Sequence, residues 1–250
     1  MIHKKSRSEI ATMREAGLIV AAALRESSAA CVPGVTTRDL DAVAEKVIRD
    51  AGARPSFLGY HGYPATLCVS VNDEVVHGIP GSRTIRDGDV VSIDCGAIVR
   101  GYHADAAVTV CVGTVPEAVR RLVAACSAAL DAGLAAVRDG GRVSDIGAAI
   151  ESFVRPHGYG LVAEYTGHGI GRALHEDPSV PNLAPRGPGH GPKLQPGIVL
   201  AIEPMLTLGS PRVEVLEDDW TVVTLDGAPA AHFEHTVALT DDGPVVLTAA

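Results

Sequence analysis

Acidic residues inside apolar, β-rich segments are the feature that most constrains how this chain can fold. Asp94 and Glu203 each follow an unbroken apolar run, and Asp105 and Glu234 lie within similar runs. An unpaired ionised carboxylate in an apolar interior costs on the order of several kcal/mol, so buried acids are normally paired or bound to a cation. Each acid taken alone also fits a strand-end residue that faces water. Four such acids, with no comparable set of Lys or Arg in the same segments, favour a bound cation.

A repeated segment predicts the architecture. Residues 86–94 (RDGDVVSID) are echoed by residues 195–203 (QPGIVLAIE), so that Asp94 and Glu203 are equivalent at an offset of 109 positions. A looser echo relates the Gly-His segments at 59–62 and 167–169. Turn-then-strand segments often look alike, so neither echo is specific alone. Both in the same order favour one domain over residues 1–250, with halves at about 8–112 and 113–247 and a site between them.

Local patterns predict helix pairs that are each followed by strands. Ser6-x-x-Glu9 has the form of a capping box that opens a helix to about Ala30, and Thr37 is expected to cap a second helix. Helices grouped with mainly antiparallel strands favour an α+β fold over a parallel α/β one. Further helices are predicted over 116–139, with Pro116 at the first helical position, and over 143–154. Strands are predicted over 66–71, 89–98, 102–112, 193–206, 220–225, 232–239 and 245–247, and an irregular loop over 182–192.

Composition excludes several classes of protein. Lys and Arg number 21 against 30 Asp and Glu, and this net charge of −9 is unfavourable for wrapping duplex DNA, although a small basic patch for RNA stays open. Five cysteines without a CxxC pair argue against a disulfide framework or a cysteine zinc site. The longest apolar run, residues 16–24, is far shorter than the roughly 20 residues that a membrane span needs. We expect a cytoplasmic protein that binds neither DNA nor a membrane.

A histidine in a glycine-rich segment adds a ligand of a different kind. His168 lies in residues 166–171 (TGHGIG), where the side chain and the backbone can both approach a ligand. A lone histidine is often structural, but the nearby glycines and acids make a ligand role equally reasonable. Four carboxylates and one imidazole suit Mn, Fe, Co or Zn, and four negative charges balance two divalent ions. Two such ions sharing carboxylates provide the chemistry needed to hydrolyse an amide.

The candidate ligands resemble, in their order, the metal ligands of the methionine aminopeptidases. Residues 202–204 (IEP) and 233–236 (FEHT) match later motifs of that family, and residues 76–80 (VHGIP) match its substrate-side histidine. The resemblance covers about residues 8–247. It is to the short bacterial type 1 form, because the distance from His175 to Glu203 leaves no room for the large insertion of type 2 enzymes. The ligand set that carries the resemblance is Asp94, Asp105, His168, Glu203 and Glu234.

The resemblance implies a fold and an activity. The fold is the pita-bread fold, in which two α+β halves about a pseudo-twofold axis share a curved, mainly antiparallel sheet covered by helices. The activity is removal of the N-terminal methionine from nascent proteins when the second residue is small, by hydroxide activated between two divalent ions. Asp94 would chelate one ion, and Asp105 and Glu234 would bridge both. The implied partners are nascent polypeptides at the ribosome, and the family precedent is a monomer.

The resemblance also implies catalytic and substrate-binding residues. Glu203 would relay a proton, His175 would hydrogen-bond the oxygen that gains charge, and His77 would contact the substrate and assist the leaving amine. Trp220 and Cys68 fit ordinary packing as well as a substrate role. Three residues depart from the family pattern and bear on the shape of the pocket: Phe57, Leu174 and His232. His232 lies two residues before Glu234 and so on the same strand face, where it fits either a contact that supports the metal site or an ordinary polar strand position. The residues expected to bind the substrate are Phe57, Tyr60, Tyr63, Cys68, His77, His175 and Trp220.

Three other interpretations are weaker. A proline dipeptidase or aminopeptidase P would carry a further N-terminal domain, for which the residues before Asp94 leave no space. A catalytically inactive relative that binds RNA or protein would be expected to lack metal ligands, and none is missing. A structural calcium site would leave His168 and its glycine-rich segment without a role.

Overall fold

Two helix pairs form the helical part of the protein, which the computed structural model describes over residues 2–184 and 191–249. The first two long helices pack against each other, and so do the other two. Two short 3₁₀ helices, η1 (Tyr60–Gly62) and η2 (Arg155–His157), lie outside these pairs. The four long helices are α1 (Arg7–Ala30), α2 (Thr37–Asp50), α3 (Glu117–Ala135) and α4 (Val143–Val154).

Capping explains where the first two helices begin. Ser6 and Glu9 form the predicted capping box at the start of α1. The predicted cap Thr37 is wrong by one residue, because the extended Thr36 accepts the Asp39 N–H and the Asp39 carboxylate returns to the Thr36 N–H. Pro116 likewise lies at the N-cap of α3 rather than inside the helix. The end predicted for that helix is four residues too late, since α3 ends at Ala135.

A nine-stranded antiparallel sheet forms the centre of the fold. Its order is β1-β4-β5-β14-β9-β7-β8, with β2 paired to β4 and β15 paired to β14. Its strands are β1 (Arg54–Pro55), β2 (Leu67–Val71), β4 (Val90–Val99), β5 (Tyr102–Cys111), β7 (Gly167–Gly169), β8 (Glu176–Val180), β9 (Val199–Ile202), β14 (Glu234–Thr240) and β15 (Gly243–Val246). Two three-stranded sheets flank it, formed by β6 (Gly160–Leu161), β10 (Met205–Thr207) and β13 (Ala230–His232), and by β3 (Glu74–Val76), β11 (Val213–Val215) and β12 (Val222–Thr224).

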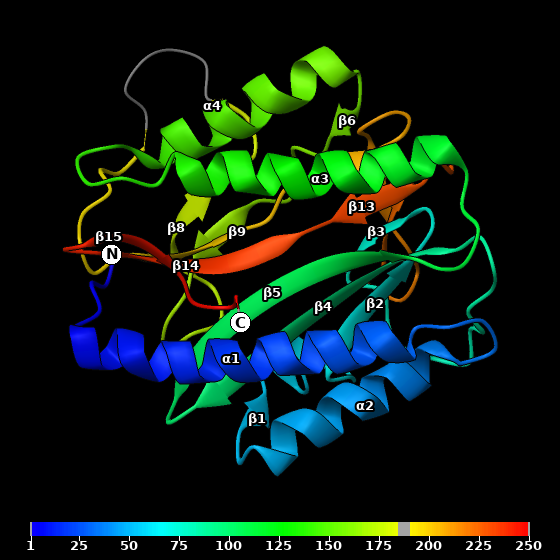
Figure 1. Ribbon diagram of the computed structural model, residues 1–250, viewed down its shortest axis with the longest axis horizontal. Coiled ribbons are helices and arrows are strands. Elements are labelled where there is room, and N and C mark those ends of the chain that lie inside the picture. Colours follow the sequence, from blue (N-terminus) through cyan, green and yellow to red (C-terminus); the bar gives the residue numbers. More distant parts are fainter. Residues whose placement is uncertain (1, 185–190, 250) are drawn as a thin grey trace.

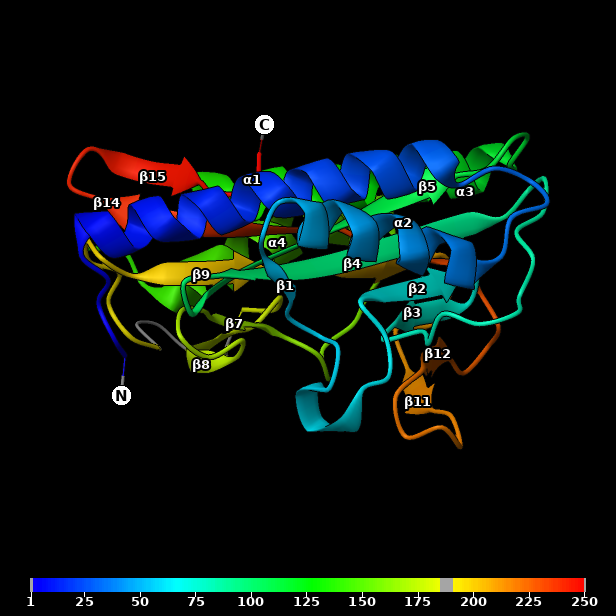
Figure 2. The same cartoon turned by 90° about the horizontal axis from the view of Figure 1, so that it is seen from below.

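The strand order shows the two-halved arrangement that the first echo predicts. The echoed segments form β4 and β9, and they lie on opposite sides of the central β5–β14 pair. The pair α1–α2 packs over the first half of the sheet and α3–α4 over the second, as Figure 1 shows. The view in Figure 2 places α1 and α2 on one side of the sheet and β11, β12 and η1 on the other. The second echo has no structural counterpart, because residues 60–62 form η1 whereas 167–169 form β7.

Two predicted strands are each divided in the structure. The segment predicted over 193–206 breaks at Glu203 and Pro204 into β9 and β10, since proline has no N–H to continue a ladder. The segment predicted over 232–239 breaks at Phe233 into β13 and β14. Residues 185–190 of the predicted loop over 182–192 lie outside the described residues. Both breaks lie next to acids that the sequence analysis assigned to the site.

Apolar side chains fill separate cores in the two halves. Leu40, Ile93 and Ala104 belong to a core beneath α1 and α2, and Leu122 and Ile146 belong to one beneath α3 and α4. Within the described part of the chain, none of the helices has the length and apolar character that crossing a bilayer requires.

Candidate metal centre

Backbone register places three of the predicted ligands on one face of the sheet. Asp94 of β4 lies opposite Ala107 of β5, and Ala107 lies opposite Glu234 of β14. Asp105 precedes Ala107 by two residues, so its side chain points to the same face. The hairpin of β4 and β5 and the first residue of β14 therefore direct Asp94, Asp105 and Glu234 into one space.

The second half adds the histidine and the fourth acid. His168 of β7 lies opposite Ala201 of β9, and Glu203 follows Ala201 by two residues, just beyond the end of that strand. The Nε2 atom of His168 is 3.6 Å from Oε1 of Glu203. The flanking Gly167 allows this close approach, because a Cβ there would lie 2.3 Å from the carbonyl oxygen of Ala201.

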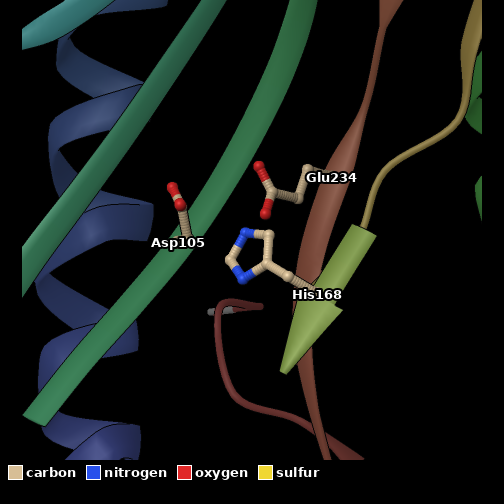
Figure 3. A group of neighbouring side chains, drawn as sticks. All are labelled: Asp105, His168 and Glu234. Atoms are coloured by element: carbon tan, nitrogen blue, oxygen red, sulfur yellow. The ribbon is translucent and has the colours of Figure 1, made fainter. Parts of the chain in front are cut away.

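Three of these side chains already form a set suited to a metal ion. One ligand atom from each of Asp105, His168 and Glu234 lies within 4.8 Å of the other two. Figure 3 shows these side chains converging from β5, β7 and β14. All three residues are buried. The first half and the second half of the chain therefore both contribute to one cluster of oxygen and nitrogen ligands.

The carboxylates are electrostatically uncompensated by the protein. Buried oxygens of Asp94, Asp105 and Glu234 have no hydrogen-bond partner, and no described Lys or Arg forms an ion pair with these acids or with Glu203. Burial raises the pKa of Asp94 to about 7, and burial together with the neighbouring acids also raises the pKa values of the other three carboxyls. Burial, assisted by His175, lowers the pKa of His168 to about 3. A neutral imidazole among carboxylates with unpartnered oxygens is a donor set that fits divalent cations.

A cavity of about 110 Å³ lies beside these ligands. Every residue that the sequence analysis assigned to catalysis, substrate or metal lines it, although their roles stay predictions. Leu174, which the sequence analysis noted only as a departure, also lines it. The complete lining is Phe57, Tyr60, Tyr63, Cys68, His77, Asp94, Asp105, His168, Leu174, His175, Glu203, Trp220 and Glu234.

The two candidate catalytic histidines line the same cavity and contact different side chains. The Nδ1 atom of His175 is 2.7 Å from the hydroxyl of Tyr60, and its ring centroid is 4.2 Å from that of His168. The ring of His77 packs edge-on to Trp220, at 6.3 Å between centroids. Burial lowers the pKa of His175, and burial with the charge of His175 lowers that of His77 to about 4.

Two further residues contact groups of the site. Tyr165, which no local pattern marks, packs edge-on to His77, at 5.7 Å between ring centroids. His232 was expected either to support the metal site or to be an ordinary polar strand residue. Its buried Nε2 atom has no hydrogen-bond partner and lies 3.7 Å from Oε2 of Glu203. The position of His232 two residues before Glu234 was the signal for this contact.

Comparison with known proteins agrees with this geometry. Residues 11–241 match the model of metallopeptidase family M24. The chain is 52% identical to methionine aminopeptidase 1 of Mycobacterium tuberculosis (strain CDC 1551 / Oshkosh), over 99% of this chain and 95% of that protein. It is 48% identical to methionine aminopeptidase 1 of Bacillus subtilis (strain 168), over 99% of both chains. The crystal structure of a methionine aminopeptidase from Thermotoga maritima matches all of both chains, with a TM-score of 0.97 and 43% identity.

The fold and the ligand cluster define a metallopeptidase of the pita-bread type. The likeness to a prolidase from Pyrococcus furiosus, with a TM-score of 0.79 and 23% identity over 65% of that chain, shows the fold alone. Since the relatives named methionine aminopeptidase match nearly from end to end, the chain belongs to the methionine aminopeptidase family within metallopeptidase family M24. The predicted α+β pita-bread fold is confirmed.

Proposed function

We propose that this protein removes the N-terminal methionine from polypeptides whose second residue is small. The observation that carries the proposal is the cluster of unpartnered carboxylates and a neutral histidine beside a cavity of aromatic and sulfur side chains. The methionine aminopeptidase relatives support the same activity. The proposal includes action on nascent chains at the ribosome, a cytoplasmic location and a monomeric state.

The acids and His168 would hold two divalent ions, which would be Co, Mn, Fe or Zn. Four carboxylates neutralise two such ions. All four line the same cavity, and three of them have a buried oxygen without a hydrogen-bond partner. When bound, the ions lower the pKa of a water molecule and polarise the scissile carbonyl. Asp94, Asp105, His168, Glu203 and Glu234 would hold these ions.

Side chains of the cavity would orient the peptide and transfer the proton from water to the leaving amine. Glu203 lies between His168 and His232 and would carry the proton from water to the leaving amine. If the Tyr60 hydroxyl donates to Nδ1 of His175, Nε2 carries the proton and can donate to the oxygen that gains charge. His77, which lines the same cavity, would bind the peptide backbone.

The methionine side chain would occupy the apolar part of the cavity. The rings of Tyr63 and Trp220 meet edge to face at 5.0 Å between centroids, and Cys68 and Phe57 lie in the same buried cluster. Sulfur–aromatic contacts stabilise a thioether by about 0.3–1.5 kcal/mol. The Tyr63 hydroxyl donates to the Leu67 and Gly78 carbonyl oxygens at 3.0 Å, which fixes the ring that forms this wall.

Hydrolysis of synthetic peptides tests the proposal directly. With Co²⁺ or Mn²⁺ added, we expect release of methionine from Met-Gly and Met-Ala peptides and little release from Met-Leu or Met-Lys peptides. Cleavage of dipeptides that end in proline, without methionine release, would favour a prolidase activity instead. Co-sedimentation with purified ribosomes and analytical ultracentrifugation test the partner and the monomeric state.

A further inference from the structure

We propose that Lys5 is a positioning residue for His175. The segment before α1 contacts the turn formed by residues 171–176, which carries His175 into the cavity. The structural part of this proposal concerns the position of that ring, and its consequence for turnover rests on the proposed function. Lys5 and the turn are separated by more than 160 residues in the sequence.

A buried ion pair joins Lys5 to the end of the turn. The Nζ atom of Lys5 is 2.7 Å from Oε2 of Glu176, and the two side chains are only 5% and 12% exposed. The other carboxylate oxygen of Glu176 accepts the N–H of Ala173 at 3.1 Å. One oxygen of Glu176 therefore forms a hydrogen bond within the turn, and the other forms the ion pair with the N-terminal segment.

The absence of a side chain at Gly171 lets Lys5 approach the turn closely. A Cβ on Gly171 would lie 2.4 Å from Cε of Lys5 and 2.7 Å from Oε1 of Glu176. The carbonyl oxygen of Gly171 accepts the N–H of His103 at 2.8 Å, and the N–H of Lys5 donates to the carbonyl oxygen of Gly197 at 2.7 Å. Lys5 and the turn are thus each hydrogen-bonded to the rest of the protein, through Gly197 and His103 respectively.

A second contact from the same N-terminal region supports the other end of the turn. The guanidinium of Arg172 lies 4.4 Å from the ring centroid of Tyr102, and the hydroxyl of Tyr102 donates to the carboxylate of Glu9. Arg172 and Glu176 are therefore both held by contacts that lead to residues 5–9. The N-terminal region therefore contacts one end of the turn directly, through Lys5, and the other end through Tyr102 of β5.

The turn positions the backbone of His175, and Tyr60 positions its ring. His175 directly precedes Glu176, and its Nδ1 atom is 2.7 Å from the Tyr60 hydroxyl. Removing the charge of Lys5 leaves the buried carboxylate of Glu176 without its cation, which strongly destabilises such a site. The turn would relax to expose that carboxylate, and the His175 ring would lose the geometry needed to donate to the reacting oxygen.

Kinetics of the metal-loaded Lys5→Met variant test the proposal. We expect kcat to fall by between about 10-fold and 10²-fold, as expected for a misplacement of about 1 Å, while KM and metal content stay unchanged. Lys5→Arg, which keeps the charge, should recover most of the activity. The matched control is Arg7→Met, which removes the exposed Arg7–Asp241 pair of 2.9 Å and should leave kcat unchanged. An unchanged kcat in Lys5→Met, or a loss matched by loss of metal, would overturn the proposal.

A spectroscopic readout separates this proposal from the proposed function. The ¹⁵N chemical shifts of the His175 ring, measured without substrate, should change in Lys5→Met and not in Arg7→Met. If these shifts change in a protein that does not cleave methionyl peptides, positioning survives and the proposed function fails. If they match the wild type, the positioning role is refuted whatever the activity. Should Lys5→Met fail to fold, Glu176→Gln removes the same ion pair, and the same shifts and kcat decide.

Discussion

The two halves of the molecule position their candidate ligands in different ways. In the first half, Asp94 and Asp105 lie inside the continuous hairpin of β4 and β5, whose ten residue pairs fix their register. In the second half, Glu203 and Glu234 lie where strands break, and His168 lies in a strand of three residues. The candidate ligands on one face of the sheet thus come from a regular hairpin in the first half and from strand breaks and a short strand in the second.

This difference assigns different tasks to the halves. A continuous ladder holds two acids rigidly but offers no loop for other contacts. The short strands of the second half are followed by the turn that carries His175 and by the segment between β11 and β12 that carries Trp220. The first half supplies a fixed pair of acids and, outside that hairpin, five of the seven residues expected to contact the substrate. The second half supplies the other three ligands together with His175 and Trp220.

Removal of a hairpin acid should have the largest effect. We expect Asp105→Ala to abolish tight metal binding and methionine release, because Asp105 belongs to the cluster of ligand atoms within 4.8 Å. Calorimetric titration with Mn²⁺ and peptide hydrolysis measure the two losses, and the exposed Asp139→Ala serves as a control. Full activity of Asp105→Ala would show that Asp105 is not a required ligand.

Removal of His175 should act on turnover without loss of metal. We expect His175→Ala to lower kcat by about 10²–10³-fold, the usual effect of removing one donor to a developing oxyanion. Metal content, measured by mass spectrometry, should stay near that of the wild type. Tyr60→Phe, which removes only the hydroxyl partner of Nδ1, should cost less. Loss of metal in His175→Ala would mean that this residue is a ligand.

Core substitutions should test whether the halves unfold together. Leu40 and Leu122 are fully buried in different cores, and each substitution by alanine should lower the free energy of unfolding by about 2–5 kcal/mol. Because β5 and β14 join the halves in one sheet, both variants should shift a single transition. Urea unfolding followed by circular dichroism and by fluorescence of Trp220, the single tryptophan, checks this. Separate transitions for the two probes would show independent halves.

The smallest expected effect is a pH dependence at His77, a first-half residue that contacts Tyr165 and Trp220 of the second. Burial lowers its pKa from an ordinary 6.5 to about 4 in the folded state. The unfolded chain then binds the extra proton between these values, so His77 makes folding less favourable as pH falls from 6.5 to about 4. The stability difference between wild type and His77→Asn should therefore shrink over this range. A difference independent of pH, measured by urea unfolding, would contradict the shift.

The sequence predicted the regular elements well because their signals are local. Capping boxes and apolar periodicity located α1 and α2 within a residue or two, and the long apolar runs located β4 and β5. Strands such as β7 and β11 are three residues long, too short for an alternating pattern. Proline at position 204 could have indicated the break after β9.

The candidate site was predictable to a similar extent. Acids in apolar runs are unusual enough to be seen without a structure, and all four line the same cavity. The contacts of Lys5 with Glu176 and of Tyr60 with His175 join segments that are far apart in the chain, and no local pattern marks such pairs. Interactions that depend on the folded arrangement, rather than on neighbours in sequence, had to be found in the structure.

The one-sided placement of the helices has a consequence for the size of what the protein can process. The helices α1 and α2 lie on one side of the sheet, while η1, β11 and β12 lie on the other (Figure 2). His175 lines the cavity and is itself exposed, so the cavity reaches the protein surface there. A polypeptide that inserts its first residue would therefore leave the residues behind it outside. Such an arrangement would accept a tripeptide and a whole protein alike, because only the first residue would enter the cavity.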